Sequence, residues 1–322
     1  MFYKGKVVLV TGGTGFVGTN FVLELLKRDA IVRVPIHHRP MQIEDSHVQQ
    51  VPADLMNEDD CHRIMQGVHF VVHAAGAVAG AGGSKHTPLK GIPANLATTA
   101  FVLEAAWASG VERFLMLGSA TFYPVVERPV KEEDAWTGPL HPTYFGYGWM
   151  RGYLEKLAEF AAMRSHMKVC LTRPTAVYGR YDDFEPSKSH VVPALIHKAV
   201  SRMAPYEVWG TGDEVRDFLH VSDMVYGGLL ALEKYAESSP VNLGYGKSFT
   251  IRELVQYVLK ATDYSDAKVI FDASKPTTIP FRMVDISKAR CVMGFEPKVS
   301  LEEGIADTVR WYRESLKSGK RH

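Results

Sequence analysis

The stretch TGGTGFVG, from Thr11 to Gly18, follows the apolar run KVVLVT and precedes a segment with the apolar spacing of a helix. In a strand, turn and helix of this kind, Gly12 permits the tight turn and Gly15 lets the backbone approach a pyrophosphate. Gly18 lets the helix pack on the strand, and the N–H groups of the helix N-terminus face the anion. The stretch therefore predicts a dinucleotide site, with an unliganded structural turn as the alternative. The residues expected to line it are Gly12, Thr14, Gly15, Phe16, Val17 and Gly18.

Outward from this stretch, short β-branched runs alternate with helical patterns from Lys6 to Ser119. Such alternation predicts a parallel sheet covered by helices on both faces. Beyond KVCLTRPTAVYG the composition shifts toward Pro, Gly and His, and the elements become shorter, up to a helix over 301–317. We expect an α/β protein with a Rossmann-type doubly wound sheet in residues 1–175 and a smaller, mainly substrate-binding domain in 176–322. Residues of about 217–250 are expected to return to the sheet.

Composition excludes several classes of function. The 322 residues include 37 basic and 36 acidic side chains, so the net charge of +1 encodes no general attraction to nucleic acid or an anionic membrane. Three cysteines with no metal-ligand or disulfide spacing favour a reducing compartment, with the cytoplasm as the default. No apolar run approaches the roughly 20 residues of a membrane span, and the N-terminus enters a strand at once, so neither a membrane anchor nor a signal peptide is expected. No metal site is predicted.

The second predicted strand bears on the choice of cofactor. In dinucleotide-binding folds it usually ends in an acidic residue that holds the ribose 2′-hydroxyl of NAD. Here it ends VPIHHRP, where His37, His38 and Arg39 would suit a 2′-phosphate. NADP(H) is therefore favoured and NAD(H) remains possible, with a solvated loop as the alternative. Asp54 is a candidate for the adenine amino group or an ordinary turn residue.

A candidate catalytic group lies farther along the chain. LGSATFYP places Ser119 at the C-terminal end of a strand, and YFGYGWMRGYLEK places Tyr147 and Arg151 four residues apart on one face of a helix. A serine, a tyrosine and a neighbouring cation can polarise a carbonyl and deliver a proton while a nicotinamide delivers hydride.

With these motifs the sequence resembles the extended short-chain dehydrogenase/reductase family, and more closely the GDP-L-fucose synthases. The resemblance covers nearly the whole chain, and its more specific parts are PSKSHVVPAL and FDASKP. It implies that Ser119 and Tyr147 are catalytic and that His190 is an acid/base in epimerisation. It further implies that a GDP-sugar or related nucleotide sugar is bound by His190, Lys198, Trp209, Arg216 and Lys275. For each cation alone, a solvated surface charge is the alternative.

The same resemblance completes the expected cofactor site and the assembly. Besides the glycine-rich stretch, the cofactor is expected to contact Arg39, Asp54, Leu55, Ala74, Ala75, Gly76, Tyr147, Arg151 and Pro174. A homodimer built from helices of the dinucleotide-binding half is also implied, and the helix through YGWMRGYLEKLAEFAAM has a suitable apolar face.

Two residues depart from the family pattern at functional positions. Arg151 stands where the family has lysine; arginine keeps the positive charge but donates in fixed directions from a longer side chain, so we expect slower but surviving hydride transfer. Thr121 stands where the family has cysteine, and a threonine hydroxyl is too weak an acid to move protons near neutral pH. We therefore expect C4 reduction with little or no 3,5-epimerisation. Ala176 replaces a usual asparagine, which puts sugar contacts in doubt.

Two other readings stay open. On the same fold the protein could be a nucleotide-sugar 4-epimerase or dehydratase, although Ala120 and Thr121 offer no acid beside Ser119 for dehydration. A non-catalytic dinucleotide-binding sensor or scaffold is the alternative of a different class, and Arg151 is the main argument for it.

Overall fold

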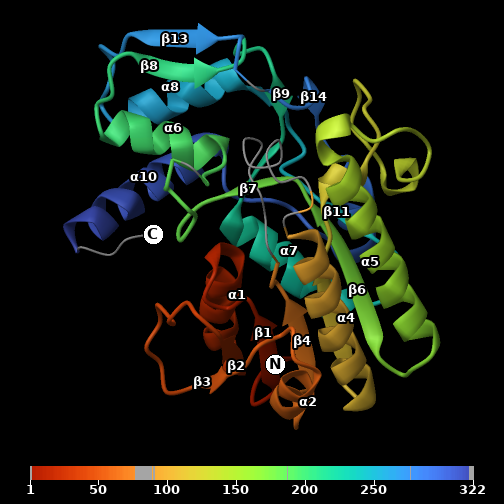
Figure 1. The fold of residues 1–322 in the computed structure, drawn as a ribbon. Helices are drawn as coiled ribbons and strands as arrows, with labels where there is room; N and C mark the ends of the chain where they lie inside the picture. Colours follow the sequence, from red (N-terminus) through yellow and green to blue (C-terminus); the bar gives the residue numbers. More distant parts are fainter. Residues whose placement is uncertain (1, 77–88, 90, 187, 276, 319–322) are drawn as a thin grey trace.

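A parallel β-sheet forms the centre of the protein (Figure 1). The computed structural model describes residues 2–76, 89, 91–186, 188–275 and 277–318, and within them this sheet has seven strands in the order β11-β6-β5-β4-β1-β2-β3. The strands are β1 (Val7–Thr11), β2 (Ile31–Ile36), β3 (Val48–Pro52), β4 (Phe70–His73), β5 (Arg113–Leu117), β6 (Lys168–Pro174) and β11 (Val241–Leu243). The order reverses between β1 and β4, and ligands of doubly wound folds bind at the carboxyl ends of the strands at such a point. The predicted fold class is confirmed.

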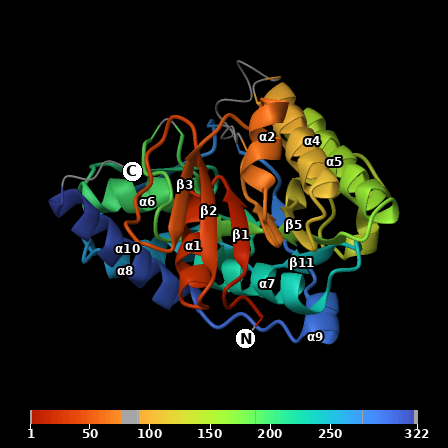
Figure 2. The same cartoon turned by 90° about the horizontal axis from the view of Figure 1, so that it is seen from below.

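Helices cover both faces of the sheet (Figure 2). Alternate residues of β1 point to opposite faces, so Val8 and Val10 enter one apolar core and Leu9 enters the other. The first core is covered by α1 (Phe16–Leu26), α7 (Val221–Lys234) and α9 (Ser287–Met293). The second is covered by α2 (Glu58–Met65), α4 (Ile92–Ala108) and α5 (Phe145–Met163).

A buried ion pair fixes α5 against the sheet. The Arg173 guanidinium of β6 donates to both carboxylate oxygens of Glu155 on α5, at 2.7–3.1 Å. Its remaining Nη1 donates to the Tyr123 hydroxyl at 3.0 Å, and that hydroxyl donates to Asn242 Oδ1 on β11 at 2.5 Å. Burying a charge is tolerated when it is paired and hydrogen-bonded in this way. The network therefore connects the helix α5 to two strands of the sheet.

The chain leaves the sheet after Pro174 and returns with α7 and β11. Within the described residues, its smaller part, at the upper left of Figure 1, packs three helices around their own apolar core, beside two short strand pairs and a three-stranded sheet. The helices are α6 (Val191–Val200), α8 (Ile251–Ala261) and α10 (Leu301–Lys317). The short strands are β7 (Ala176–Tyr178), β8 (Tyr206–Trp209), β9 (Val215–Arg216), β10 (Phe218–His220), β12 (Phe249–Thr250), β13 (Val269–Asp272) and β14 (Phe281–Arg282). Of these, β12, β9 and β14 form the three-stranded sheet in that order. The division at residue 175 stays a prediction.

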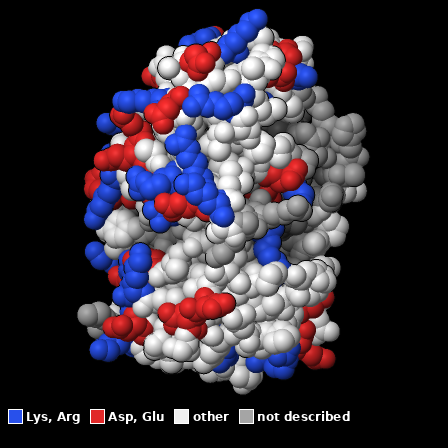
Figure 3. All heavy atoms as spheres, turned by 90° about the vertical axis from the view of Figure 1, so that its left-hand side faces the viewer, with Lys and Arg blue, Asp and Glu red and all other residues white. Residues whose placement is uncertain are grey.

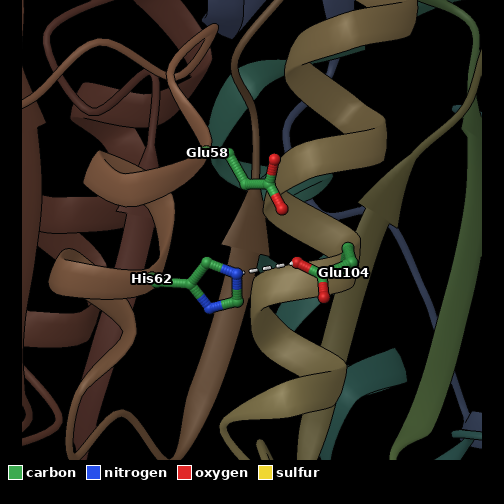
Figure 4. A group of neighbouring side chains, drawn as sticks. All are labelled: Glu58, His62 and Glu104. Carbon is green, nitrogen blue, oxygen red and sulfur yellow. Dashed lines mark ion pairs between the residues drawn. The ribbon is translucent and has the colours of Figure 1, made fainter.

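The surface carries charges of both signs. On the face in Figure 3, lysine and arginine lie among aspartate and glutamate rather than in one continuous patch. On the outside of the sheet, Glu58 and His62 of α2 point toward Glu104 of α4, and His62 Nε2 lies 3.0 Å from Glu104 Oε2 (Figure 4). Among the described residues, no helix combines the length and apolar character needed to cross a membrane.

Candidate functional site

The glycine-rich turn between β1 and α1 has a shape that only glycine allows. Gly12 has φ +67°, and a Cβ there would lie 2.8 Å from the carbonyl oxygen of Ala74. A Cβ on Gly18 would lie 2.1 Å from the Gly12 carbonyl oxygen. Gly15 precedes α1 without a side-chain cap, and the first turn, which contains Phe16, holds no acidic residue. The positive helix end is therefore open to an anion.

A pocket of about 220 Å³ lies beside this turn. It is lined by Gly12, Thr14, Pro35, His37, His38, Arg39, Ala53, Leu55 and Ala75. The pocket thus brings together most of the residues that were predicted to contact the adenosine part of the cofactor. Pro35 and Ala53 also line it but were not predicted, because neither is charged nor part of a recognised motif. The Asp54 carboxylate accepts a hydrogen bond from the Met56 backbone N–H at 2.9 Å and lies 3.9 Å from His37 Nε2.

The serine lies just beyond β5, at the carboxyl edge of the sheet. Ser119 caps a short 3₁₀ turn over Ala120–Phe122, and its Oγ accepts the Thr121 backbone N–H at 3.2 Å. The two hydroxyl oxygens of Ser119 and Thr121 are 2.9 Å apart, within hydrogen-bonding distance. The residue at the cysteine position of the family is therefore in direct contact with the catalytic serine candidate.

The tyrosine and the arginine meet on the inner face of α5. The Tyr147 hydroxyl accepts hydrogen bonds from Arg151 Nε at 3.1 Å and Nη2 at 2.5 Å. Arg151 Nη1 also donates to the carbonyl oxygen of Leu117, the last residue of β5, at 3.3 Å. A Cβ added to Gly76 would lie 3.3 Å from Arg151 Nη2, so the segment after β4 also approaches this group. Arg151 thus connects the tyrosine to the strand ends rather than extending into solvent.

A buried histidine supports this edge of the sheet. His73 lies at the end of β4, with Nδ1 2.9 Å from Thr11 Oγ1 and Nε2 3.0 Å from Thr99 Oγ1. Burial, with the positive charge of Arg151 as a smaller cause, lowers the pKa of His73 to about 3, so the ring is neutral. Thr11 Oγ1 also accepts the Ala75 backbone N–H at 3.2 Å. His73 was not among the predicted site residues, because a histidine in an apolar strand carries no motif.

In the smaller part, three of the predicted substrate residues lie around β8 and β13. Lys198 of α6 donates to the Glu207 carbonyl oxygen at 2.7 Å, and Trp209 Nε1 donates to the Glu207 carboxylate at 3.0 Å. Burial lowers the pKa of Lys198; Glu207 opposes this shift and the charge of Lys275 adds to it. Trp209 pairs with Asp272 in the strand register, and Lys275 Nζ is 4.0 Å from that carboxylate. Two cations and an exposed indole therefore share this edge.

Arg216 is another of the predicted substrate-binding residues. It lies beside Arg282, which was not predicted from the sequence as a site residue. Arg216 of β9 and Arg282 of β14 are register partners. Burial lowers the pKa of both, that of Arg282 to about 10, and the charge of Arg216 is the second cause at Arg282. Across the described ranges neither guanidinium forms an ion pair with a carboxylate; Arg216 Nη2 donates instead to Thr278 Oγ1 at 3.1 Å, and Arg282 Nη1 donates to the Pro124 carbonyl oxygen at 3.2 Å. Two desolvated cations without a paired anion make an attractive position for a diphosphate.

His190 precedes α6 and remains open to solvent, although the surrounding protein lowers the pKa of its ring and Asp183 opposes the shift. No hydrogen bond joins His190 to Ser119 or Tyr147 within the described part of the chain. Pro174 ends β6 opposite Leu243 of β11, again at the carboxyl edge of the sheet. Two residues of the family-specific motifs, Ser187 and Pro276, lie outside the described residues.

The fold and this edge of the sheet define a Rossmann-type protein with a dinucleotide-binding turn. Residues 8–244 match the NAD dependent epimerase/dehydratase family. The chain is 33% identical to a probable GDP-L-fucose synthase 1 of Oryza sativa subsp. japonica, with 99% of this chain and 95% of that protein covered. The protein therefore belongs to the NAD dependent epimerase/dehydratase family, as the extended short-chain dehydrogenase/reductase resemblance predicted.

Two further relatives differ in the reaction named for them. A dTDP-4-dehydro-6-deoxy-D-allose reductase of a Streptomyces species is 30% identical, with 97% of each chain covered. A UDP-glucose 4-epimerase of Thermotoga maritima, solved with UDP-glucose, has a TM-score of 0.86 at 27% identity, covering 96% of this chain and 99% of that chain. The prediction that the protein is an NAD(P)-dependent enzyme of this family is confirmed.

Proposed function

We propose that the protein is an NADP(H)-dependent oxidoreductase that reduces a 4-keto-6-deoxy GDP-sugar at C4. The observation that carries the proposal is the contact of Tyr147 with Arg151 at the carboxyl edge of the sheet, beside the strand that leads to Ser119. The rice relative named as a GDP-L-fucose synthase supports the GDP-sugar, and the Streptomyces relative named as a 4-dehydro-6-deoxy sugar reductase supports the reaction.

The residues present fit a dinucleotide. Gly12 and Gly18 pack against neighbouring backbone and so keep the turn tight, while Gly15 at the start of α1 presents no side chain to an approaching pyrophosphate and the helix offers its positive end. The neighbouring pocket receives His37, His38 and Arg39 and has no acidic side chain in its lining. This composition favours a ribose 2′-phosphate, and hence NADP(H) over NAD(H).

The proposed mechanism assigns one role to each side chain. Tyr147 and Arg151 are the residues that would hold a nicotinamide at this edge, and when bound it would supply the hydride for C4. Ser119 donates a hydrogen bond to the sugar carbonyl, and Tyr147 delivers the proton to the oxygen that becomes the C4 hydroxyl. Arg151 stabilises the phenolate left on Tyr147, because a positive charge at hydrogen-bond distance favours the ionised form.

The cations of the smaller part would bind the rest of the substrate. We assign the diphosphate to Arg216 and Arg282, since a desolvated guanidinium gains most from an anionic partner. Lys198, Trp209 and Lys275 form a second group around β8, where an indole and two cations suit a nucleotide base and its phosphates.

Epimerisation at C3 and C5 is not part of the proposed reaction. It needs acids and bases that exchange protons near neutral pH on either side of the sugar. Thr121 lies against Ser119, where the family cysteine would stand, and its hydroxyl does not ionise in that range. His190 remains as an acid/base for at most one face of the sugar.

The test is NMR analysis of the product in D₂O, after purified protein is mixed with NADPH and GDP-4-keto-6-deoxymannose. We expect NADPH oxidation and a product reduced at C4 without deuterium at C3 or C5. Tyr147→Phe is the matched control and should abolish reduction even at NADPH concentrations that saturate the variant. Deuterium at both carbons would show a complete epimerase/reductase, and unconsumed NADPH with unchanged sugar would reject the proposed substrate.

A 4-epimerase is the second candidate, because the Thermotoga maritima UDP-glucose 4-epimerase shares the fold over almost the whole chain. Such an enzyme keeps its dinucleotide and needs no net hydride. A purified protein that carries a mixture of oxidised and reduced cofactor, and that interconverts UDP-glucose and UDP-galactose without added NADPH, would favour it. A protein that binds NADPH and turns over neither sugar would favour a sensor or scaffold.

We further propose a homodimer formed through α5. The outward face of α5 carries Trp149, Tyr153, Phe160 and Met163, which are 39–73% exposed and recur at helical spacing. The opposite face of the helix holds the residues packed on the sheet, so this apolar face is available for a second copy. Light scattering should give twice the chain mass for the wild type and one chain mass for Phe160→Glu. The cytoplasm is the proposed compartment, consistent with three free cysteines.

A further inference from the structure

Two adjacent histidines line the pocket beside the glycine-rich turn. His37 and His38 follow β2, and their ring centroids are 3.6 Å apart at an interplanar angle of 35°. Both rings and the neighbouring Arg39 are exposed, and all three residues line the pocket. A phosphate on the ribose of a dinucleotide bound at the turn would therefore meet two imidazoles as well as one permanent cation.

The charges that face this pair are few. Asp54, from the segment after β3, lies 3.9 Å from His37 Nε2, and Arg39 lies in the same loop as the rings. Among the described residues, the others that line the pocket carry no charge: Gly12, Thr14, Pro35, Ala53, Leu55 and Ala75. Protonation of both rings would thus place three positive charges against one carboxylate, and the two imidazolium groups would repel each other at this distance. A dianionic phosphate beside the two rings would offset that repulsion.

We propose that His37 and His38 discriminate NADP from NAD by taking up a proton from solvent when the 2′-phosphate binds, an inference that rests on the proposed NADP(H) dependence. Histidine is the side chain whose ordinary titration falls between pH 5 and 8, so an adjacent dianion can change its protonation state near neutral pH. Arg39 contributes attraction but no proton uptake, because arginine stays charged throughout this range. NAD presents a neutral hydroxyl at the same place and induces no uptake.

The test is calorimetric titration of the full chain with NADP⁺ and with NAD⁺ at pH 7.5, in buffers of different ionisation enthalpy. At this pH the 2′-phosphate is almost fully dianionic, so the ligand itself contributes little to the proton count. We expect the protein to take up on the order of one proton per NADP⁺ bound and none per NAD⁺ bound. Because proton uptake accompanies binding, the affinity for NADP⁺ should fall by up to about tenfold for each unit of increase in pH. His37→Asn with His38→Asn should abolish the uptake and the pH dependence.

The control is His47→Asn, an exposed histidine beside the start of β2 that has its own aspartate partner and does not line the pocket; it should leave the proton uptake unchanged. NADP⁺ binding without uptake, or uptake that survives the double variant, would overturn the proton-linked discrimination while the proposed function stands. Failure of both dinucleotides to bind would overturn both. The single variants, each with a normal circular dichroism spectrum, keep the test valid if the double variant misfolds.

Discussion

Replacing Arg151 by methionine tests the central contact of the proposed site. The substitution removes two hydrogen bonds to the Tyr147 hydroxyl, at 3.1 and 2.5 Å, and the charge behind them. Hydrogen bonds to charged groups contribute about 1.5–3 kcal/mol each, and because Arg151 is only partly buried the lower value applies, giving about 3 kcal/mol. Only the part that strengthens as the phenolate forms accelerates the reaction.

If half of that energy is already present before proton transfer, kcat falls about tenfold; if all of it develops in the transition state, kcat falls about 150-fold. The assay is NADPH oxidation at saturating keto sugar, with NADPH affinity measured separately by fluorescence. Arg151→Lys keeps the positive charge, so the fall in log kcat of this variant should be at most half of the fall in log kcat of Arg151→Met. Arg164→Met, an exposed position at the end of the same helix, is the control and should remain near wild type. A fall of less than threefold in Arg151→Met would refute the role of Arg151.

Three further outcomes are expected. Thr121→Cys should introduce deuterium at C3 or C5 of the product in D₂O, because a thiol exchanges protons near neutral pH; unchanged isotope content would contradict our account of Thr121. Glu155→Gln should reduce the free energy of unfolding in urea by about 3–5 kcal/mol, because it leaves the Arg173 guanidinium buried without its carboxylate partner. The control is Glu159→Gln, which breaks an exposed ion pair and should lose no more than about 1 kcal/mol. Burial raises the pKa of Asp182 from 3.8 to about 7, so the Asp182 carboxyl binds its proton more tightly in the folded state than in the unfolded state. The stability that this protonated carboxyl contributes is therefore lost as the pH rises from about 4 to about 7. Asp182→Asn should therefore gain up to roughly 4 kcal/mol of unfolding free energy relative to wild type between pH 4 and 8, and a pH-independent difference would contradict the raised pKa.

Features that depend on neighbours in the sequence could be predicted. The helix expected over 301–317 is found at Leu301–Lys317, where Ser300 and Glu303 form a capping box and the apolar spacing continues for several turns. The helix α2 was missed, because its eight residues, EDDCHRIM, are mostly charged and too short to show a repeated apolar stripe.

Residues whose role depends on tertiary contacts could not be found in this way. Arg282 matters because strand pairing places it beside Arg216, 66 positions earlier in the chain, and no local pattern encodes that register. The same limit applies to His73, whose two threonine partners come from β1 and α4. The pair of Tyr147 and Arg151 was accessible because both lie on one helix, four residues apart.

The late return of β11 to the sheet has a consequence for how the protein is made. During synthesis β6 is complete at Pro174, but the strand that pairs with its free edge begins only at Val241, and α7, which covers that region, begins at Val221. A nascent chain that ends between these points exposes an apolar strand edge, which is a template for pairing with other chains. A fragment that stops at residue 175 should therefore aggregate rather than fold.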